Sequence, residues 1–134
     1  REKGVDALFH YTTETFYNVH GGEERGGSYT DNIGFDLKLD LNKMFGGGNT
    51  TFLLKLSQRD GSSVSEKYVA PSEGGNTFTV QEAFGGQTLK LANVQFNTRF
   101  LEDRLDVAYG RLVANDDFLR SPLYCQFVNN SFCG

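Results

Sequence analysis

The chain has 134 residues and a mass of 14.9 kDa, which is the size of one domain. It carries 17 acidic and 13 basic residues, a formal net charge of −4, whereas a nucleic-acid-binding protein normally shows a clustered positive excess. No run approaches the roughly 20 consecutive apolar residues of a membrane-spanning helix. The composition does not exclude a membrane β-barrel, because strands that alternate apolar and polar residues have a modest mean hydropathy. Sixteen glycines, twelve phenylalanines and six tyrosines with only two prolines indicate short strands joined by loops.

The first two predicted strands cover residues 5 to 19 and 32 to 42. In the second, apolar residues occupy all five odd positions and none of the even ones. A period of two over eleven residues predicts a strand with two chemically different faces. The first strand follows the same pattern less strictly. The apolar set of the second strand is Ile33, Phe35, Leu37, Leu39 and Leu41, opposite Asp36, Lys38 and Asp40.

Three more strands are predicted over residues 51 to 59, 89 to 100 and 104 to 111, because apolar and polar residues alternate there as well. Glycine-rich turns fill residues 20 to 27 and 42 to 49, a long polar loop fills 60 to 87, and 101 to 103 form a tight turn. After Val113 the alternation stops, so residues 115 to 134 are predicted to be a loop with one helical turn at 116 to 121. The fold class is therefore all-β, an antiparallel up-and-down meander.

The alternation leaves two architectures open. A soluble β-sandwich would expose the polar face to water. A membrane barrel would turn that face to an aqueous lumen and the apolar face to lipid. Five strands are too few to close a barrel, for which about eight is the lower limit, so a barrel made of this chain alone would be incomplete.

Catalytic and metal-binding chemistry has little support in the sequence. No nucleophile elbow of the Gly-x-Ser-x-Gly type occurs, and Cys125 and Cys133 are too far along the chain from His10 and His20 to form a zinc motif. The two cysteines would form a local disulfide in an exported protein or remain free thiols in a cytosolic one. We expect no enzyme activity, no cofactor and no metal.

Short segments spread over nearly all of the chain form an ordered series: Glu2-Lys3-Gly4-Val5-Asp6, Asn18-Val19-His20-Gly21-Gly22 with Arg25-Gly26, Asp36-Leu37-Lys38-Leu39-Asp40-Leu41, Phe100-Leu101-Glu102-Asp103-Arg104-Leu105, Tyr109-Gly110-Arg111-Leu112, Asp116-Asp117-Phe118 and Phe127-Val128-Asn129-Asn130-Ser131-Phe132. In this order they resemble the carbohydrate-selective porins of the OprB family. The resemblance implies a transmembrane β-barrel of about sixteen strands in the bacterial outer membrane.

By this resemblance, residues 1–134 are the N-terminal part of a single barrel domain, with strands one to five and the start of the third external loop. Loops 18 to 28, 60 to 87 and 113 onward would be external, and turns 43 to 49 and 101 to 104 periplasmic. The family's fourth strand commonly carries acidic residues on its inward face, where this chain has Asn93 and Asn97.

The implied function is passive diffusion of small carbohydrates, with outer-membrane lipid as the other partner, no nucleic acid, and homo-oligomerisation left open. The rival hypothesis is a secreted soluble β-sandwich that binds glycans, and a third is a structural outer-membrane protein without flux. Because the third external loop passes through an oxidising periplasm, Cys125 and Cys133 are predicted to be joined.

The predicted pore constriction combines Arg59 from the wall with residues of the inward-folding third loop. Arg59 would donate to sugar hydroxyls, since the planar guanidinium suits vicinal oxygens better than a lysine does. The alternative is that these side chains are ordinary wall and loop residues. The full constriction set is Arg59, Asn97, Asp116, Asp117 and Arg120, and the predicted lumen wall is Asp36, Lys38, Lys55 and Asn93.

Overall fold

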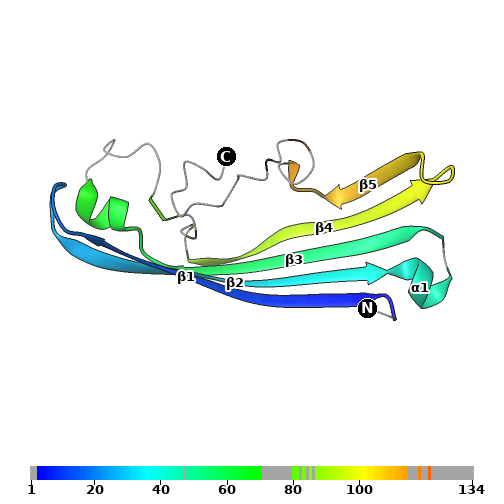
Figure 1. Cartoon of the computed structure of the whole chain (residues 1–134), viewed down its shortest axis with the longest axis horizontal. Helices are drawn as coiled ribbons and strands as arrows, with labels where there is room; N and C mark the ends of the chain where they lie inside the picture. The colour runs from blue at the N-terminus through cyan, green and yellow to red at the C-terminus, as the bar shows by residue number, and fades with distance from the viewer. Residues whose placement is uncertain are drawn as a thin grey trace. The chain divides into compact units, whose positions relative to one another are not determined.

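The computed structural model describes residues 3–46, 48–70, 80, 81, 83, 85, 87–114, 118 and 121. Within them, five strands form one antiparallel sheet in the order of the chain (Figure 1). The strands are β1 (Val5–Asn18), β2 (Gly26–Asp40), β3 (Thr50–Gly61), β4 (Thr88–Phe100) and β5 (Leu105–Arg111). The predicted all-β, up-and-down meander is therefore confirmed. A sandwich needs a second sheet to pack on the first, and the described residues form only one.

Strand β2 differs from its prediction at both ends. It begins at Gly26 rather than at residue 32, and it ends at Asp40 because the short helix α1 (Leu41–Phe45) starts there. The Asp40 carboxylate caps this helix by accepting from the Lys43 backbone N–H at 3.0 Å, and Gly46 closes it at φ 68°. Leu41 is therefore a helical residue, and its prediction as the last outward residue of the strand was wrong.

The turn between β4 and β5 is as tight as predicted. Leu101, Glu102 and Asp103 all have positive φ, and the Arg104 N–H donates to the Leu101 carbonyl at 3.3 Å. The Asn49 amide donates to the Asp103 carboxylate at 2.7 Å, which joins this turn to the turn between α1 and β3. Side-chain hydrogen bonding of this kind compensates for a backbone conformation that non-glycine residues rarely adopt.

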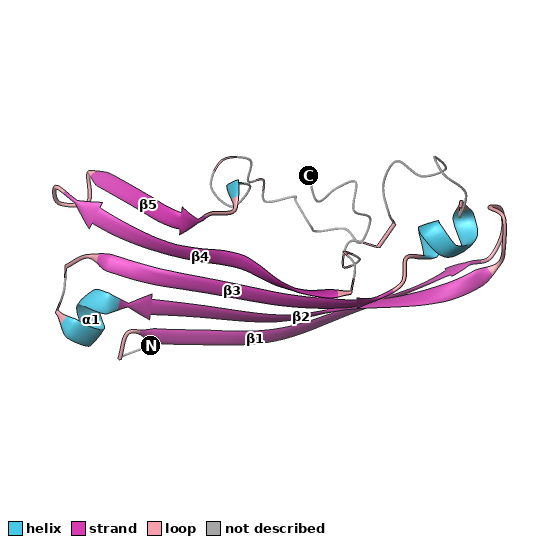
Figure 2. Ribbon diagram, turned by 180° about the vertical axis from the view of Figure 1, so that it is seen from behind, coloured by secondary structure: helices cyan, strands magenta, loops and turns pink. Residues whose placement is uncertain are grey.

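The connection between β3 and β4, predicted to be a polar loop, contains a short π-helix, η1 (Ser65–Val69), drawn in cyan in Figure 2. Its widened turn is defined by the Ala70 N–H, which donates to the Ser65 carbonyl at 3.0 Å. Ser63, Val64 and Ser65 are buried. This part of the connection therefore packs against other residues, unlike a loop that is exposed to water.

The chain divides into two compact units, and strands β1 to β4 contribute residues to both. Unit 1 contains Arg1–His10, Gly34–Ser57 and Lys90–Leu119; unit 2 contains Tyr11–Ile33, Gln58–Leu89 and Arg120–Gly134. In unit 1, aromatic rings pack across neighbouring strands. The Phe52 and Phe96 centroids lie 4.9 Å apart, and Phe96 stacks on Tyr109 at 5.4 Å. None of the helices among the described residues has the length and apolar character to span a bilayer.

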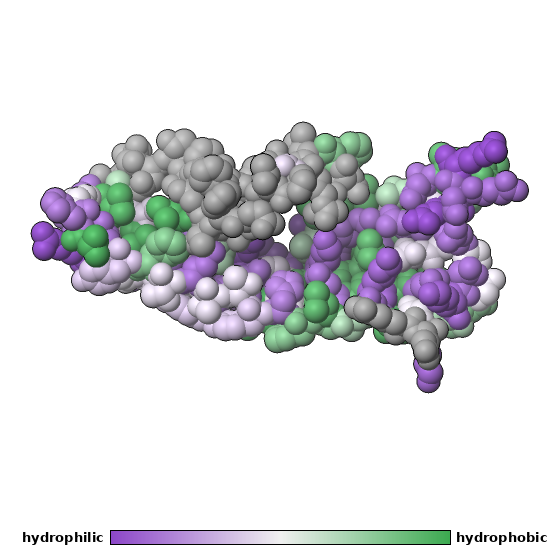
Figure 3. Space-filling model, viewed as in Figure 1, coloured by the Kyte–Doolittle hydropathy of each residue, from purple (hydrophilic) through white to green (hydrophobic). Residues whose placement is uncertain are grey.

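The buried residues of the described part are mostly polar. Among the described residues, only Val64 and Ala83 are buried hydrophobic side chains, and both belong to unit 2. Many large apolar side chains are instead exposed, including Phe9 at 67% and Tyr109 at 52%. In Figure 3 green hydrophobic and purple hydrophilic residues lie side by side on the coloured part of the visible face.

Candidate functional site

The sheet has a polar face and an apolar face, defined by alternate residues of each strand. The polar face takes the even positions of β1, β2 and β5 and the odd positions of β3 and β4; the apolar face takes the others. The register of β4 and β5 shows the match, since Asn97 pairs with Ala108 and Phe96 with Tyr109. On β2, Asp36, Lys38 and Asp40 therefore lie on the polar face, as predicted, and Lys55, Arg59 and Asn93 share that face.

An amide ladder runs along β4 on the polar face of unit 1. Asn93 Nδ2 donates to Gln95 Oε1 at 2.7 Å, and Gln95 Nε2 donates to Asn97 Oδ1 at 2.9 Å. Asn93 is 2% exposed, and its Oδ1 has no hydrogen-bond partner among the described residues. The chain of amides fixes the orientation of each side chain, so the ladder presents oriented donors and acceptors without net charge.

A recess of about 250 Å³ lies beside the ladder and brings opposite charges together. Its lining includes Asn97 with Lys38 and Asp40 of β2 and Arg99 and Asp106 of β4 and β5. Arg99 Nε lies 3.5 Å from Asp106 Oδ2, and both side chains are more than half exposed. The recess is thus polar, close to charge balance and open, which suits a neutral ligand with many hydroxyl groups and weak binding.

A second recess, of about 320 Å³, gathers three of the predicted wall residues. Asp36, Lys38 and Lys55 line it together with Asp6, and Leu8 and Leu53 add apolar surface. The sequence grouped Asp36 with Lys38 on one strand, but the closeness of Lys55 depends on the pairing of β2 with β3.

Arg59 lies in unit 2 and contacts a segment that the sequence did not connect with it. A Cβ atom added to Gly85 would lie 2.7 Å from Arg59 Nη1, so the half-buried guanidinium packs directly against this glycine of the β3–β4 connection. The prediction placed Arg59 beside the third external loop. Its predicted neighbours there, Asp116, Asp117 and Arg120, lie outside the described residues, as do Cys125 and Cys133.

Sequence reasoning missed a buried polar cluster in unit 2, centred on Gln81. This glutamine is completely buried and hydrogen-bonds to Ser28 and Thr30 of β2 and to the Val64 backbone. Ser28 and Thr30 alternate with Tyr29 and Asp31, a pattern that would have extended the second strand toward Gly26. Nothing local in the sequence marks Gln81 itself.

Comparison with known proteins gives this arrangement a context. The family model described as "Carbohydrate-selective porin, OprB family" matches residues 24–134. Porin B of Pseudomonas aeruginosa is 33% identical over 136 aligned positions, which cover 99% of this chain and 30% of Porin B.

Two solved structures of Pseudomonas putida OprB are also similar. The high-pH structure matches 98% of this chain and 32% of its own chain, with a TM-score of 0.90 and 32% identity. The low-pH structure matches 87% of this chain and 36% of its own, with a TM-score of 0.62 and 26% identity. The chain spans about a third of the length of these relatives.

Proposed function

The chain belongs to the OprB family of carbohydrate-selective porins, and from this premise we propose that it forms part of the wall of a channel through which small carbohydrates diffuse. Proteins of this family are β-barrels of the bacterial outer membrane, and that is where this chain is located. The family points to a channel rather than an enzyme.

The observation that carries the proposal is the exposed apolar face. On β5, Leu105, Val107 and Tyr109 are exposed although they are apolar or aromatic, and Phe9 of β1 is exposed as well. An exposed apolar sheet face of this kind is unfavourable in water but matches the lipid-facing band of a membrane barrel. The face opposite it is polar, as an aqueous lumen requires.

The polar face explains how neutral sugars would pass. As a sugar moves along the channel, its hydroxyl groups exchange hydrogen bonds with water for hydrogen bonds with side chains of the wall. The oriented amides of Asn93, Gln95 and Asn97 can both donate to and accept from these hydroxyl groups. The recess beside Asn97 adds both signs of charge in near balance. Such contacts are individually weak in water, which allows the sugar to leave as readily as it enters.

We assign Arg59 to sugar contact within unit 2. Its guanidinium lies on the polar face and is held against Gly85, which reduces the conformational freedom that binding would otherwise cost. A planar donor fork can bind two neighbouring sugar oxygens at once, whereas a lysine ammonium acts as a point charge.

Conductance across a planar bilayer tests the channel and the role of Arg59 together, in a polypeptide of the relatives' full length that contains this chain. We expect stable ion conductance that added sugar reduces. Arg59→Ala should weaken the sugar block and shift ion selectivity toward cations, because a fixed positive charge is lost. Arg59→Lys is the matched control: it should keep the selectivity and still weaken the block. Absence of conductance would refute the channel, and unchanged block in both variants would leave Arg59 an ordinary wall residue.

Three further predictions concern residues or strands that the described part of the chain does not contain. The barrel is proposed to have about sixteen strands, and Asp116, Asp117 and Arg120 are proposed to line its narrowing. Cys125 and Cys133 are proposed to form a disulfide, which would stabilise the chain by roughly 2–3 kcal/mol in the chain-entropy model. Thiol labelling of unreduced, denatured protein tests the disulfide, and two reactive thiols would contradict it.

A further inference from the structure

Two leucines interrupt the polar face of unit 1. Leu8 takes an even position of β1 and Leu53 an odd position of β3, and both positions belong to the polar face. Leu8 is 58% exposed and Leu53 is half-buried. The other positions of β3 on this face hold Thr51, Lys55, Ser57, Arg59 and Gly61. Leu53 is therefore an apolar side chain in a row that is otherwise polar or glycine.

A single exposed leucine would need no explanation, but these two line the same recess of about 320 Å³. They belong to the strands on either side of β2. The charged side chains of the recess are two carboxylates and two ammonium groups, whose formal charges cancel: Asp6, Asp36, Lys38 and Lys55. Small-molecule sites typically have about 300–1,000 Å³ and combine apolar surface with a few polar groups. The recess therefore suits a small neutral ligand that has an apolar surface of its own.

Leu53 contributes to both recesses of unit 1. Together with Lys38 it lines the larger recess and also the recess of about 250 Å³ beside Asn97. The Leu53 side chain thus lies where the two recesses meet, and a ligand that moves from one recess to the other passes over it. Leu53 is therefore the apolar contact that both recesses have in common.

A sugar in its ring form has the two kinds of surface that these recesses offer. Hydroxyl groups surround the edge of the ring, where carboxylates can accept hydrogen bonds and ammonium groups can donate them. The faces of the ring carry C–H groups, which gain free energy when they leave water against an apolar side chain. An acyclic polyol with a similar number of hydroxyl groups has no fixed C–H face, and ordering its rotatable bonds costs conformational entropy.

We infer that Leu53 is a specificity-determining residue, and that the two recesses it joins favour cyclic sugars over acyclic polyols. The inference rests on the proposed channel function and adds to it the class of carbohydrate that this part of the wall selects. The charged side chains of the recesses contact hydroxyl groups of either kind of solute, so they contribute affinity without distinguishing the two. The apolar contact of Leu53 is made only with a ring face, and it is the contact that discriminates.

Block of the ion current by glucose and by sorbitol tests the inference, in a polypeptide of the relatives' full length that contains this chain. In the wild type, we expect glucose to reach half-block at a lower concentration than sorbitol. Leu53→Ser should raise the half-block concentration of glucose about threefold, the effect of losing roughly 25 Å² of apolar contact, and leave that of sorbitol unchanged. The ion conductance without sugar should stay the same, because the substitution changes no charge.

Leu91→Ser is the matched control. Leu91 also lies on the polar face of unit 1 and is 39% exposed, but it lines neither recess, so its substitution should leave the preference for glucose as in the wild type. If Leu53→Ser does not fold, Leu53→Ala removes most of the contact without adding a hydroxyl group and should lower the preference in the same direction.

The possible results separate this inference from the proposed function. Equal block by glucose and sorbitol in a conducting wild-type protein would overturn the selection of ring forms. A preference that is unchanged in a folded Leu53 variant, or that falls equally in Leu91→Ser, would overturn the role of Leu53. A wild-type protein without conductance would instead refute the channel itself.

Discussion

Units 1 and 2 share strands β1 to β4, and unit 1 also contains β5, but the two units bury different kinds of side chain. In unit 2 the polar face is covered by the β3–β4 connection, and Thr30, Ser65 and Gln81 are completely buried there. In unit 1 that face holds open recesses, and only the amides Asn93 and Gln95 are buried side chains among its described residues. Among the residues that the structure describes, neither unit contains an apolar core of the kind found in soluble domains.

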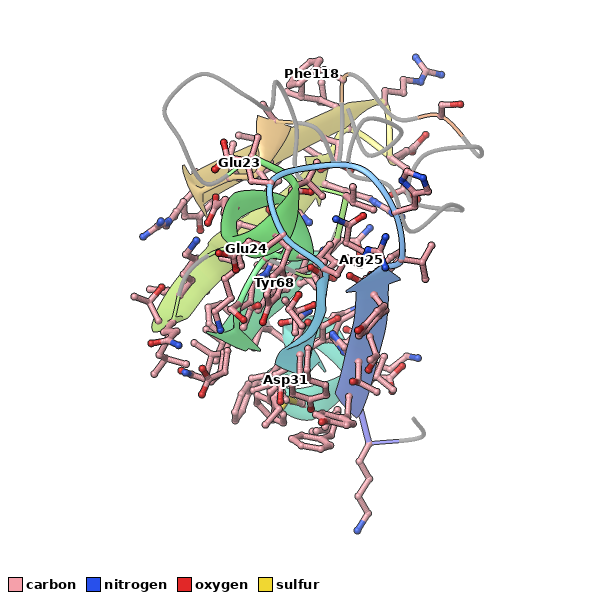
Figure 4. The ribbon with its side chains drawn as sticks, turned by 90° about the vertical axis from the view of Figure 1, so that its left-hand side faces the viewer. Glu23, Glu24, Arg25, Asp31, Tyr68 and Phe118 are labelled. Atoms are coloured by element: carbon pink, nitrogen blue, oxygen red, sulfur yellow. The ribbon has the colours of Figure 1, made fainter. Side chains whose placement is uncertain are left out.

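The apolar face differs between the units as well. On β3 its residues are Phe52, Leu54 and Leu56 in unit 1, but Gln58 and Asp60 in unit 2. On β2 the apolar-face positions of unit 2 include Ile33 but also Asp31, which is labelled in Figure 4 and whose carboxylate accepts from the Tyr29 hydroxyl at 2.9 Å. From this contrast we expect lipid to cover the apolar face of unit 1 and the same face of unit 2 to tolerate polar groups, as at a membrane–water interface.

The largest expected effect comes from a charge on the apolar face of unit 1. Leu37→Arg should cost about 2–4 kcal/mol, because a charge facing lipid near the membrane midplane loses its hydration. Lys38→Ala, one residue away on the polar face, should cost much less. The folded fraction in the outer membrane, read from heat-dependent gel mobility, checks this, and equal tolerance of the two changes would contradict the assignment of the faces.

The same experiment can compare the units on one strand. Gln58→Arg places a charge on the same face of β3 in unit 2, and Leu54→Arg does so in unit 1. We expect Gln58→Arg to assemble normally and Leu54→Arg to fail as Leu37→Arg does. Comparable loss in both variants would mean that lipid reaches the apolar face of unit 2 as well.

A smaller effect is expected where a ring packs on a glycine in unit 2. Gly26→Ala should displace the Tyr68 ring and destabilise the protein by about 1–3 kcal/mol, the usual cost of overpacking. In a Tyr68→Ala background, the same change should cost almost nothing, since the ring is gone. Urea unfolding of the four proteins of this double-mutant cycle measures the coupling, and additive effects would show that the ring and the glycine are independent.

The smallest effect is expected from the exposed ion pair of unit 1. Arg99→Ala should lower the free energy of unfolding by less than about 1 kcal/mol, because both side chains are well solvated. The loss of a positive charge from the recess should nevertheless raise cation selectivity. A stability loss as large as that of Gly26→Ala would mean that unit 1 also depends on its polar face.

The strands and their faces follow from local pattern alone. A strict period of two over residues 32 to 42 specifies which side chains share a face, and this information needs no knowledge of distant residues. The tight turn after Phe100 was equally visible. The helix α1 was missed because its apolar Leu41 continues the alternation, whereas the Asp40 cap ends the strand and begins the helix, and Gly46 ends the helix.

What only the tertiary structure decided is the docking of the β3–β4 connection. Gln81 and its partners Ser28 and Thr30 are 53 and 51 residues apart in the chain. The contact of Arg59 with Gly85 likewise depends on how the connection returns to the sheet. The alternation of apolar and polar residues shows which face of a strand is apolar, but it does not show which distant segment of the chain covers that face. A polar residue that will be buried by hydrogen bonds looks, in sequence, the same as one left in water.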